Sequence, residues 1–244
     1  MSTGYSAPQP NKRRNVMIAG LIAVVVVVAA ILIVVSSGDN KSQSSTPAAN
    51  APLNGLKETK AMLDGIPQSG NTLGKKSAPV TMIEYADYQC PFCRDYALNT
   101  MPILINDYVR TGKLRMEFMP LTFIGPDSET AARAGTAAGQ QNLEWNFTHL
   151  FYFNQGQERS GYVTDAFINK LYAGAGVDAA KANAYRTTSA AAVPLATAAA
   201  GAQKYGVAST PSFVVGQTGG PYTKLDVEIS NADAFKSAFD ALLK

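Results

Sequence analysis

Metal-binding residues are scarce in this chain, which has two cysteines and one histidine among 244 residues. A structural zinc ion needs about four nitrogen or sulfur ligands, and Cys90, Cys93 and His149 cannot supply them within one chain. A transient site for a soft ion such as Cu(I) stays open as a minor alternative. His149 lies in the aromatic stretch WNFTHLFYF, where we expect a core or surface helix residue and no metal ligand.

The chain also lacks an internal repeat, a glycine-rich phosphate loop and a charge excess in its main body. It has 21 basic and 18 acidic residues, and Lys12, Arg13 and Arg14 account for the difference because residues 1–15 contain no acid. The neutral remainder gives no reason to predict nucleic-acid binding. The glycines within 135–139 lie in a small-residue helical stretch, and close helix packing explains them.

A long hydrophobic run follows this basic tip. Residues 16–35 carry no charge and are almost all aliphatic, and a helix of that length spans the hydrocarbon core of a bilayer, about 30 Å. A cleaved signal peptide is the alternative, but its apolar region is usually about 7–15 residues long. We therefore predict an uncleaved transmembrane signal-anchor at 16–35. Its basic flank, 1–15, should remain in the cytoplasm, which places the C-terminal part on the extracytoplasmic side of the cell membrane.

After the predicted anchor, the sequence composition indicates first a linker and then a folded domain. Residues 36–52 are small, polar and free of aromatic residues, which is typical of a flexible linker. From residue 53 onward the chain has the apolar patterning of a folded domain, and we predict one domain over 53–244.

The pattern within this domain predicts an α/β fold. Residues 80–88 form an apolar, β-branched run typical of a buried strand, and 114–123 alternate as a second strand. Between them lies a helical pattern that Pro102 should kink or divide. Strand, helix and strand in this order close most easily as parallel neighbours. The alanine-rich stretch of about 127–205 predicts an insertion of four or five helices. Strands in VASTPSFVVG and TKLDVEI and a terminal helix in NADAFKSAFDALLK then complete the domain.

The two cysteines lie three positions apart in the stretch EYADYQCPFCRDYA. A disulfide across so short a loop constrains the unfolded chain little, which argues against a structural staple and for redox exchange. Cys90 lies where a strand meets a helix, and Pro91 suits the first helical turn. The helix N-terminus stabilises a thiolate, the nucleophile of such chemistry. We predict that Cys90 attacks, that Cys93 resolves the mixed disulfide, and that Pro91 and Phe92 set the redox balance. No cofactor is needed, because the cysteines carry the electrons.

EYADYQCPFC, the later GVASTPSFVV and the helical block between them resemble the DsbA-like disulfide oxidoreductases of the thioredoxin superfamily. The resemblance covers about residues 70–244 and implies a thioredoxin fold with an all-helical insertion. It also implies a cis peptide bond at Pro211 beside the active cysteines, with the backbone of Thr210 pairing with an extended substrate segment. Glu84 matches the family's acidic position beneath the site, where it would accept a proton from the resolving thiol. A carboxylate facing water at a strand edge is the alternative for Glu84.

Two departures from the family shape the expected function. Phe92 occupies a position where the best-studied oxidases have histidine, which changes how the neighbouring thiolate is stabilised. Residues 53–70 are too short for the dimerisation domain of the related isomerases, which favours a monomeric oxidase. The expected function is a membrane-anchored enzyme that forms disulfides in exported proteins. The resemblance implies reoxidation by a membrane redox partner of the DsbB or vitamin K epoxide reductase type.

Two alternatives remain open at the level of sequence. One is a disulfide reductase or isomerase that works from the dithiol state. The other belongs to a different class: a tethered, non-catalytic module that binds an exported partner or handles copper.

Overall fold

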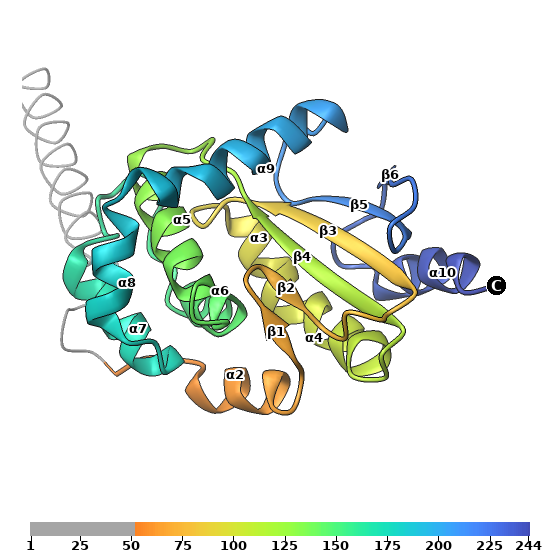
Figure 1. Ribbon diagram of the computed structural model, residues 1–244, viewed down its shortest axis with the longest axis horizontal. Helices are drawn as coiled ribbons and strands as arrows, with labels where there is room; N and C mark the ends of the chain where they lie inside the picture. Colours follow the sequence, from red (N-terminus) through yellow and green to blue (C-terminus); the bar gives the residue numbers. More distant parts are fainter. Residues whose placement is uncertain (1–51) are drawn as a thin grey trace, which may run out of the picture. The chain divides into compact units, whose positions relative to one another are not determined.

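A mixed six-stranded sheet forms the centre of the part of the chain that the structure describes, residues 52–244 (Figure 1). The structure is a computed structural model. The predicted cytoplasmic tip (1–15) and transmembrane anchor (16–35) lie outside the described residues, as does the predicted linker (36–52) except for its last residue. Within residues 52–244, no helix is both long and apolar enough to cross a membrane.

The order of strands places the segment before the cysteines at the middle of the sheet. The strands are β1 (Gln68–Ser69), β2 (Thr72–Leu73), β3 (Val80–Ala86), β4 (Leu114–Pro120), β5 (Ser212–Gln217) and β6 (Thr223–Leu225), in the spatial order β1-β2-β4-β3-β5-β6. β3 pairs in parallel with β4 and antiparallel with β5, which confirms the predicted parallel β-α-β unit. All seven residues of β3 are buried, because helices cover both faces of the sheet.

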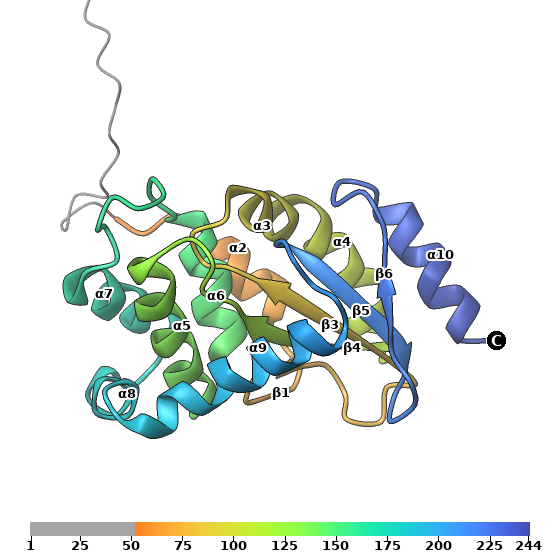
Figure 2. The ribbon, with the colours of Figure 1, turned by 90° about the horizontal axis from the view of Figure 1, so that it is seen from above.

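The two faces of the sheet carry different helices (Figures 1 and 2). On one face lies α9 (Val193–Lys204), and on the other lie the helix that follows the cysteines and α10 (Ala232–Leu242). The cluster under α9 contains Ile83, Tyr85, Leu121, Ala198, Ala202, Val207 and Val214. On the opposite face the rings of Tyr96 and Phe213 lie 4.6 Å apart between their centroids. Burying such rings supplies much of the free energy that holds helix to sheet.

The helix after the cysteines changes type along its length. It comprises α3 (Pro91–Asp95), a π-helical turn (Tyr96–Thr100), α4 (Met101–Leu104) and a second π-helical turn (Ile105–Val109). Pro102 lies in the first turn of α4, directly after the first π-helical turn. A π turn is wider than an α turn and tolerates the missing proline N–H. The predicted kink or division therefore takes the form of a change in helical type within one continuing helix.

The stretch between β4 and β5 is helical, as the sequence predicts. It contains α5 (Pro126–Gly139), α6 (Glu144–Phe153), α7 (Asp165–Ala175), α8 (Ala179–Arg186), a 3-10 turn (Ser189–Ala192) and α9. Thr164 and Asp178 cap α7 and α8 by accepting hydrogen bonds from first-turn N–H groups, which stabilises both helices. α2 (Leu56–Leu63) adds a further helix, and its Thr59 contacts His149 of α6. Figure 1 shows α5 to α8 beside one end of the sheet, and α9 returning across it.

Several strand predictions are corrected by the structure. The strand predicted over 80–88 ends at Ala86, and the one predicted over 114–123 ends at Pro120. Only three residues of TKLDVEI form β6, so residues 226–229 are not strand. The short β1–β2 hairpin lies in a segment whose turn residues hide any strand pattern. The hairpin forms because β2 pairs with β4. This pairing is a tertiary contact, and the sequence around β2 alone does not predict it.

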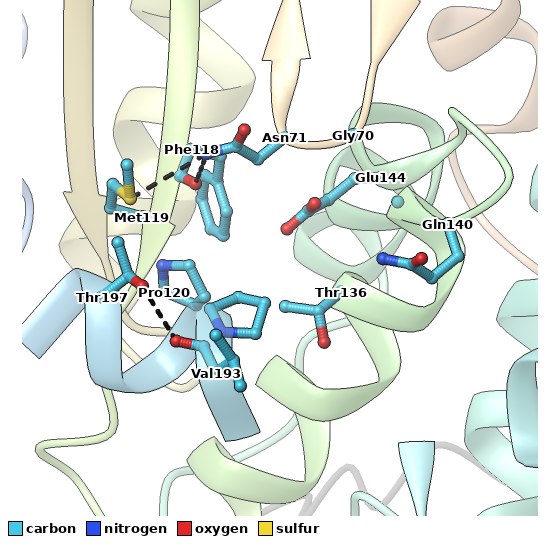
Figure 3. Close-up of a pocket in the computed structure, with 12 residues that line it drawn as sticks. Gly70, Asn71, Phe118, Met119, Pro120, Thr136, Gln140, Glu144, Val193 and Thr197 are labelled. Carbon is cyan, nitrogen blue, oxygen red and sulfur yellow. Dashed lines mark hydrogen bonds between the residues drawn. The ribbon is translucent and has the colours of Figure 1, made fainter. Parts of the chain in front are cut away.

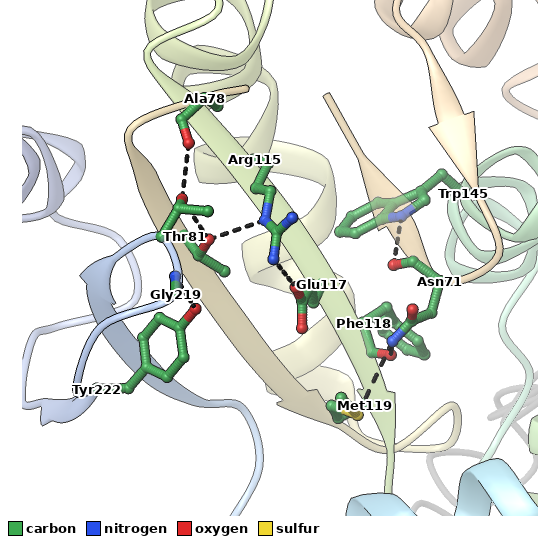
Figure 4. Close-up of polar contacts among 11 residues, drawn as sticks. Asn71, Ala78, Thr81, Arg115, Glu117, Phe118, Met119, Trp145, Gly219 and Tyr222 are labelled. Atoms are coloured by element: carbon green, nitrogen blue, oxygen red, sulfur yellow. Dashed lines mark hydrogen bonds and ion pairs between the residues drawn. The ribbon is translucent and has the colours of Figure 1, made fainter. Parts of the chain in front are cut away.

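A polar cluster joins three strand segments at the end of the sheet opposite the cysteines (Figure 4). The Arg115 Nε donates to Thr81 Oγ1 at 2.9 Å, and its guanidinium pairs with Glu117 at 2.8 Å. Thr81 Oγ1 also lies 2.8 Å from the hydroxyl of Thr218, which follows β5. These contacts fix the register of β3, β4 and β5, and hence the position of the cysteines at their other end.

Close packing explains the helical glycines, as the sequence predicts. Tyr88 lies in an aromatic cluster with its hydroxyl 2.8 Å from Thr148 Oγ1, and its ring packs against Phe118. A Cβ on Gly135 of α5 would overlap the hydroxyl of Tyr88, and a Cβ on Gly139 would meet the carboxylate of Glu144. α5 therefore approaches its neighbours more closely than any other residue type at these positions would allow.

We expect Gly135→Ala to destabilise the protein by about 1–3 kcal/mol, the usual effect of overpacking a core. On an exposed helix surface the same change would stabilise the protein by up to about 1 kcal/mol. The sign of the change in unfolding free energy therefore shows whether Gly135 is closely packed. Tyr88→Phe removes the hydroxyl that the new methyl group meets, and Gly135→Ala should cost less in that background. Urea unfolding of the four proteins in this cycle measures both effects. An equal cost in the two backgrounds would contradict this account.

Candidate active site

The two cysteines lie where the central strand gives way to a helix. β3 ends at Ala86, a three-residue turn follows, and Cys90 is the N-cap residue of α3 with extended backbone angles (φ −71°, ψ 121°). Pro91 occupies the first helical turn, where its missing N–H has no helical partner to lose. The unpaired N–H groups at this helix start point toward the N-cap side chain. The predicted strand-to-helix placement of Cys90 is therefore correct.

The environment separates the acidities of the two thiols. The pKa of Cys90 is lowered from 9.0 to about 6. The hydrogen bond from the Cys93 thiol contributes most, and the Thr210 side chain and the N–H groups of Cys93 and Phe92 add to it, which together outweigh burial. Burial raises the pKa of Cys93 well above its ordinary value. One sulfur is thus a ready thiolate and the other a protonated thiol, which suits an attacking and a resolving cysteine.

A segment 120 residues away in sequence completes the site. The Thr210–Pro211 peptide bond is cis, and the carbonyl oxygen of Thr210 lies 3.3 Å from the Sγ of Cys90, which donates to it in the protonated thiol state. Pro211 directly precedes β5, which pairs with β3. Sheet pairing therefore carries this predicted motif to the cysteines.

Glu84 lies within β3 and is only 1% exposed, which rules out the alternative of a carboxylate facing water. Neither of its carboxylate oxygens has a hydrogen-bond partner among the described residues. Burial raises its pKa to about 8, so the group is mainly protonated at neutral pH. Its charge is among the influences that raise the pKa of Cys93.

The turn before Cys90 is held by buried polar side chains. The carboxylate of Asp87 accepts from the N–H groups of Gln89 (2.9 Å) and Ile124 (3.1 Å). The amide of Gln89 donates to Ser128 Oγ at 2.9 Å and accepts from the Arg159 N–H at 2.7 Å. These hydrogen bonds come from the turn's own residues and from the helical insertion and the loops beside it.

Gln155 is a candidate positioning residue that sequence reasoning missed. Its Nε2 donates to the carbonyl oxygens of Tyr88 (2.7 Å) and Cys90 (3.0 Å). Gln155 therefore joins the loop after α6 to the backbone of the nucleophile itself. No local signal marks it, because it lies in an ordinary polar loop 65 residues beyond Cys90.

A surface groove begins beside the cysteines. Phe92, which is 64% exposed, lines it together with Thr210 and Pro211. Residues 226–230 also line it, and the groove has a volume of about 710 Å³. The sequence predicts a strand over most of these residues, whereas in the structure they form an irregular segment.

His149 and a second pocket lie apart from this chemistry. Burial lowers the pKa of His149 to about 4, and its Nδ1 lies 2.8 Å from Thr59 Oγ1, so it is a neutral core residue as predicted. Among residues 52–244 no cluster of histidine, cysteine or acidic side chains could hold a metal ion. The second pocket, of about 340 Å³, has the buried Glu144 directed into it, and no residue of the cysteine site lines it (Figure 3). Burial raises the pKa of Glu144 to about 8.

The structure is a thioredoxin fold in which two cysteines of different acidity lie at the start of a helix. Comparison with known proteins supports this fold. A thioredoxin family model matches residues 68–226, more than half of the chain, and the chain therefore belongs to this family. The probable disulfide bond formation protein D of Bacillus cereus is 34% identical over 99 residues, which cover 40% of this chain and 46% of that protein. The chain thus spans about half the length of the curated relatives it matches.

Solved structures show the same architecture. Oxidised BdbD from Bacillus subtilis superposes with a TM-score of 0.63 at 21% identity, over 72% of this chain and 96% of that chain. A thioredoxin-like oxidoreductase from Silicibacter pomeroyi gives a TM-score of 0.54 at 26% identity, over 74% of this chain and 98% of that chain. These matches support a thioredoxin-like α/β fold with a helical insertion.

The lowered pKa of Cys90 makes the stability of the reduced protein depend on pH. The folded pKa is about 6 against 9.0 for an ordinary cysteine, so the gain is complete above pH 9 and is lost as pH falls through 6. Between pH 6 and 8 the reduced form should gain up to about 1.4 kcal/mol per pH unit over the oxidised form, which has no thiolate. Glu84 is present in both forms and largely cancels. Urea unfolding with and without dithiothreitol measures this difference, and in dithiothreitol the Cys90→Ser variant should lack the pH dependence that the Cys90 thiolate gives the reduced wild-type protein.

Gln155→Glu should raise the pKa of Cys90. The new carboxylate would face two carbonyl oxygens and add a negative charge near the thiolate, which disfavours the charged sulfur. Thiolate absorbance at 240 nm during a pH titration gives the pKa directly. Gln203→Glu adds the same charge on the exposed side of α9 and serves as the control. An equal midpoint in both variants would show that Gln155 has no influence on the nucleophile.

Proposed function

We propose that this protein is a membrane-anchored, extracytoplasmic thiol–disulfide oxidoreductase that forms disulfides in exported proteins. The observation that carries the proposal is the acidity difference between Cys90, with a pKa near 6, and the buried Cys93. A structural disulfide, or two buried cysteines that only fill space in the core, needs no such difference in acidity. Disulfide exchange does, because one sulfur must leave readily while its partner waits in the protonated state.

The proposed reaction moves two electrons from substrate thiols to the cysteine pair. A substrate thiolate attacks the Sγ of Cys90, the Cys90–Cys93 bond breaks, and a mixed disulfide forms at Cys90. The sulfur of Cys93 leaves and takes a proton, for which we propose the buried, protonated Glu84 as the donor. A second substrate thiolate then attacks the substrate sulfur of the mixed disulfide. This forms the substrate disulfide and releases Cys90 as a thiolate, its stable form.

The direction of electron flow follows from the stability of that thiolate. A stabilised thiolate favours the reduced protein, and an oxidant of this kind passes its disulfide on. The corresponding pKa is about 7 in thioredoxin and about 3.5 in DsbA. A value near 6, with Phe92 beside the resolving cysteine in place of histidine, supports an oxidant of intermediate strength. We therefore place its reduction potential between about −270 mV and about −120 mV.

The proposed location and partners rest on the sequence. The apolar run 16–35 behind a basic tip supports an anchor that leaves 53–244 outside the cytoplasm. In that compartment the substrates are exported proteins with reduced cysteines. Each cycle leaves the pair reduced, so reoxidation needs a partner, for which we propose a membrane protein of the DsbB or vitamin K epoxide reductase type. The name of the Bacillus cereus relative, a probable disulfide bond formation protein, supports the same role.

Refolding of a reduced disulfide-containing protein tests the proposal. Cys90→Ser should abolish the acceleration of disulfide formation by the full chain, because the attacked sulfur is gone. With oxidised glutathione present as the oxidant, Cys93→Ala should instead accumulate mixed disulfides between Cys90 and the substrate, because no neighbouring thiol can displace the substrate, and non-reducing gels resolve them. Undiminished oxidation by Cys90→Ser would show that the protein is a non-catalytic binding module. Equilibration in glutathione buffers gives the potential, and a value at or below that of thioredoxin would favour a reductase.

A further inference from the structure

The groove beside Cys90 has a distinct electrostatic character. Three carboxylates line it, those of Asp95, Asp226 and Glu228. All three side chains are exposed, and no lysine or arginine lines the groove. The ion pairs between described residues use other acids, among them Glu117, Glu129 and Asp165. The groove lined by Phe92 and Thr210 therefore carries three carboxylates that form no ion pair with a described residue.

The groove also offers apolar surface between these charges. The exposed ring of Phe92 lines it, as do the half-buried Val227 and Ile229, which pack partly against the core. Val227 and Ile229 alternate in sequence with the exposed Asp226 and Glu228, so the lining combines apolar and acidic side chains. A lysine or arginine side chain has the matching character, since its aliphatic stem lies along apolar surface while its charged end remains near water.

We propose that this groove selects reduced substrate segments in which lysine or arginine lies next to the reactive cysteine. The inference rests on the proposed function and adds the chemical class of its substrates. The occupant is an extended polypeptide segment, because Thr210, whose carbonyl oxygen lies 3.3 Å from the Sγ of Cys90, is itself one of the residues that line the groove. An acidic segment meets like charge in the groove and is disfavoured.

The expected effect of the groove charges on binding depends strongly on the salt concentration. For a separation of about 7 Å in water, one charge pair changes binding by about threefold without screening. Three such pairs give about tenfold for one positive side chain in 0.01 M salt, and only about threefold at 0.15 M. Low ionic strength therefore reveals the preference, and its loss with added salt identifies it as electrostatic.

The test uses the oxidised full chain in detergent and three short peptides that differ only beside their single cysteine. The neighbours are lysine, glutamine or glutamate, and the measurement is the second-order rate at which each peptide reduces the Cys90–Cys93 disulfide. Basic neighbours also make the peptide thiol more acidic, so each rate is divided by the rate of the same peptide with a small soluble disulfide. The corrected rates should fall from lysine to glutamine to glutamate, with about tenfold between lysine and glutamine in 0.01 M salt.

A charge-matched pair of variants locates the preference. Asp226→Asn with Glu228→Gln should reduce the lysine-to-glutamine ratio to about twofold. Glu58→Gln with Asp64→Asn removes two exposed acids of the α2 region that do not line the groove, and should retain the wild-type ratio. Equal corrected rates for the three peptides, or an unchanged ratio in the groove variant, would overturn the inference. If no peptide reduces the disulfide, the proposed function itself fails.

Discussion

The acidity difference between two sulfurs one helical turn apart is the constraint on which the rest of this structure depends. Cys90 must be stable as a thiolate although it is only 4% exposed, and Cys93 must stay protonated at 0% exposure. Burial alone disfavours both thiolates. Only a helix N-terminus and donors directed at one sulfur can separate them, so the site has to lie where a strand ends and a helix begins. The central strand β3, buried at all seven positions, supplies that fixed end.

The helical insertion is part of this solution, because it holds the turn that carries the nucleophile. Gln155 donates to the carbonyl oxygens of Tyr88 and Cys90, and Gln89 joins the same turn to α5 and to the loop that contains Arg159. Buried polar groups of this kind are costly unless every partner is in place. A displacement of α5 or α6 would therefore disturb the cysteine turn, and insertion and sheet are expected to fold as one unit around it.

Sequence predicts the local parts of this site and misses the parts that tertiary contacts create. The cysteine pair, the proline after Cys90, the buried strand and the helical block leave periodic or compositional signals, and their positions are correct to within a few residues. The strand predicted in TKLDVEI largely fails, since only β6 finds a pairing partner and residues 226–230 line the groove. Gln155 leaves no local signal at all. Its role exists only because α6 returns the chain to the cysteine turn.

Phe92 can now be assigned a role different from the one its sequence position suggests. The largest contributions to the low pKa of Cys90 are the Cys93 thiol, Thr210 and the N–H groups of the helix start. All of these are present without a histidine beside Cys93. The ring of Phe92 is instead 64% exposed and lines the groove. In the proposed function, this ring in place of a histidine leaves the thiolate without one stabilising group and offers the substrate an apolar surface. The proposal thus assigns redox strength and substrate contact to different atoms of the same four-residue motif.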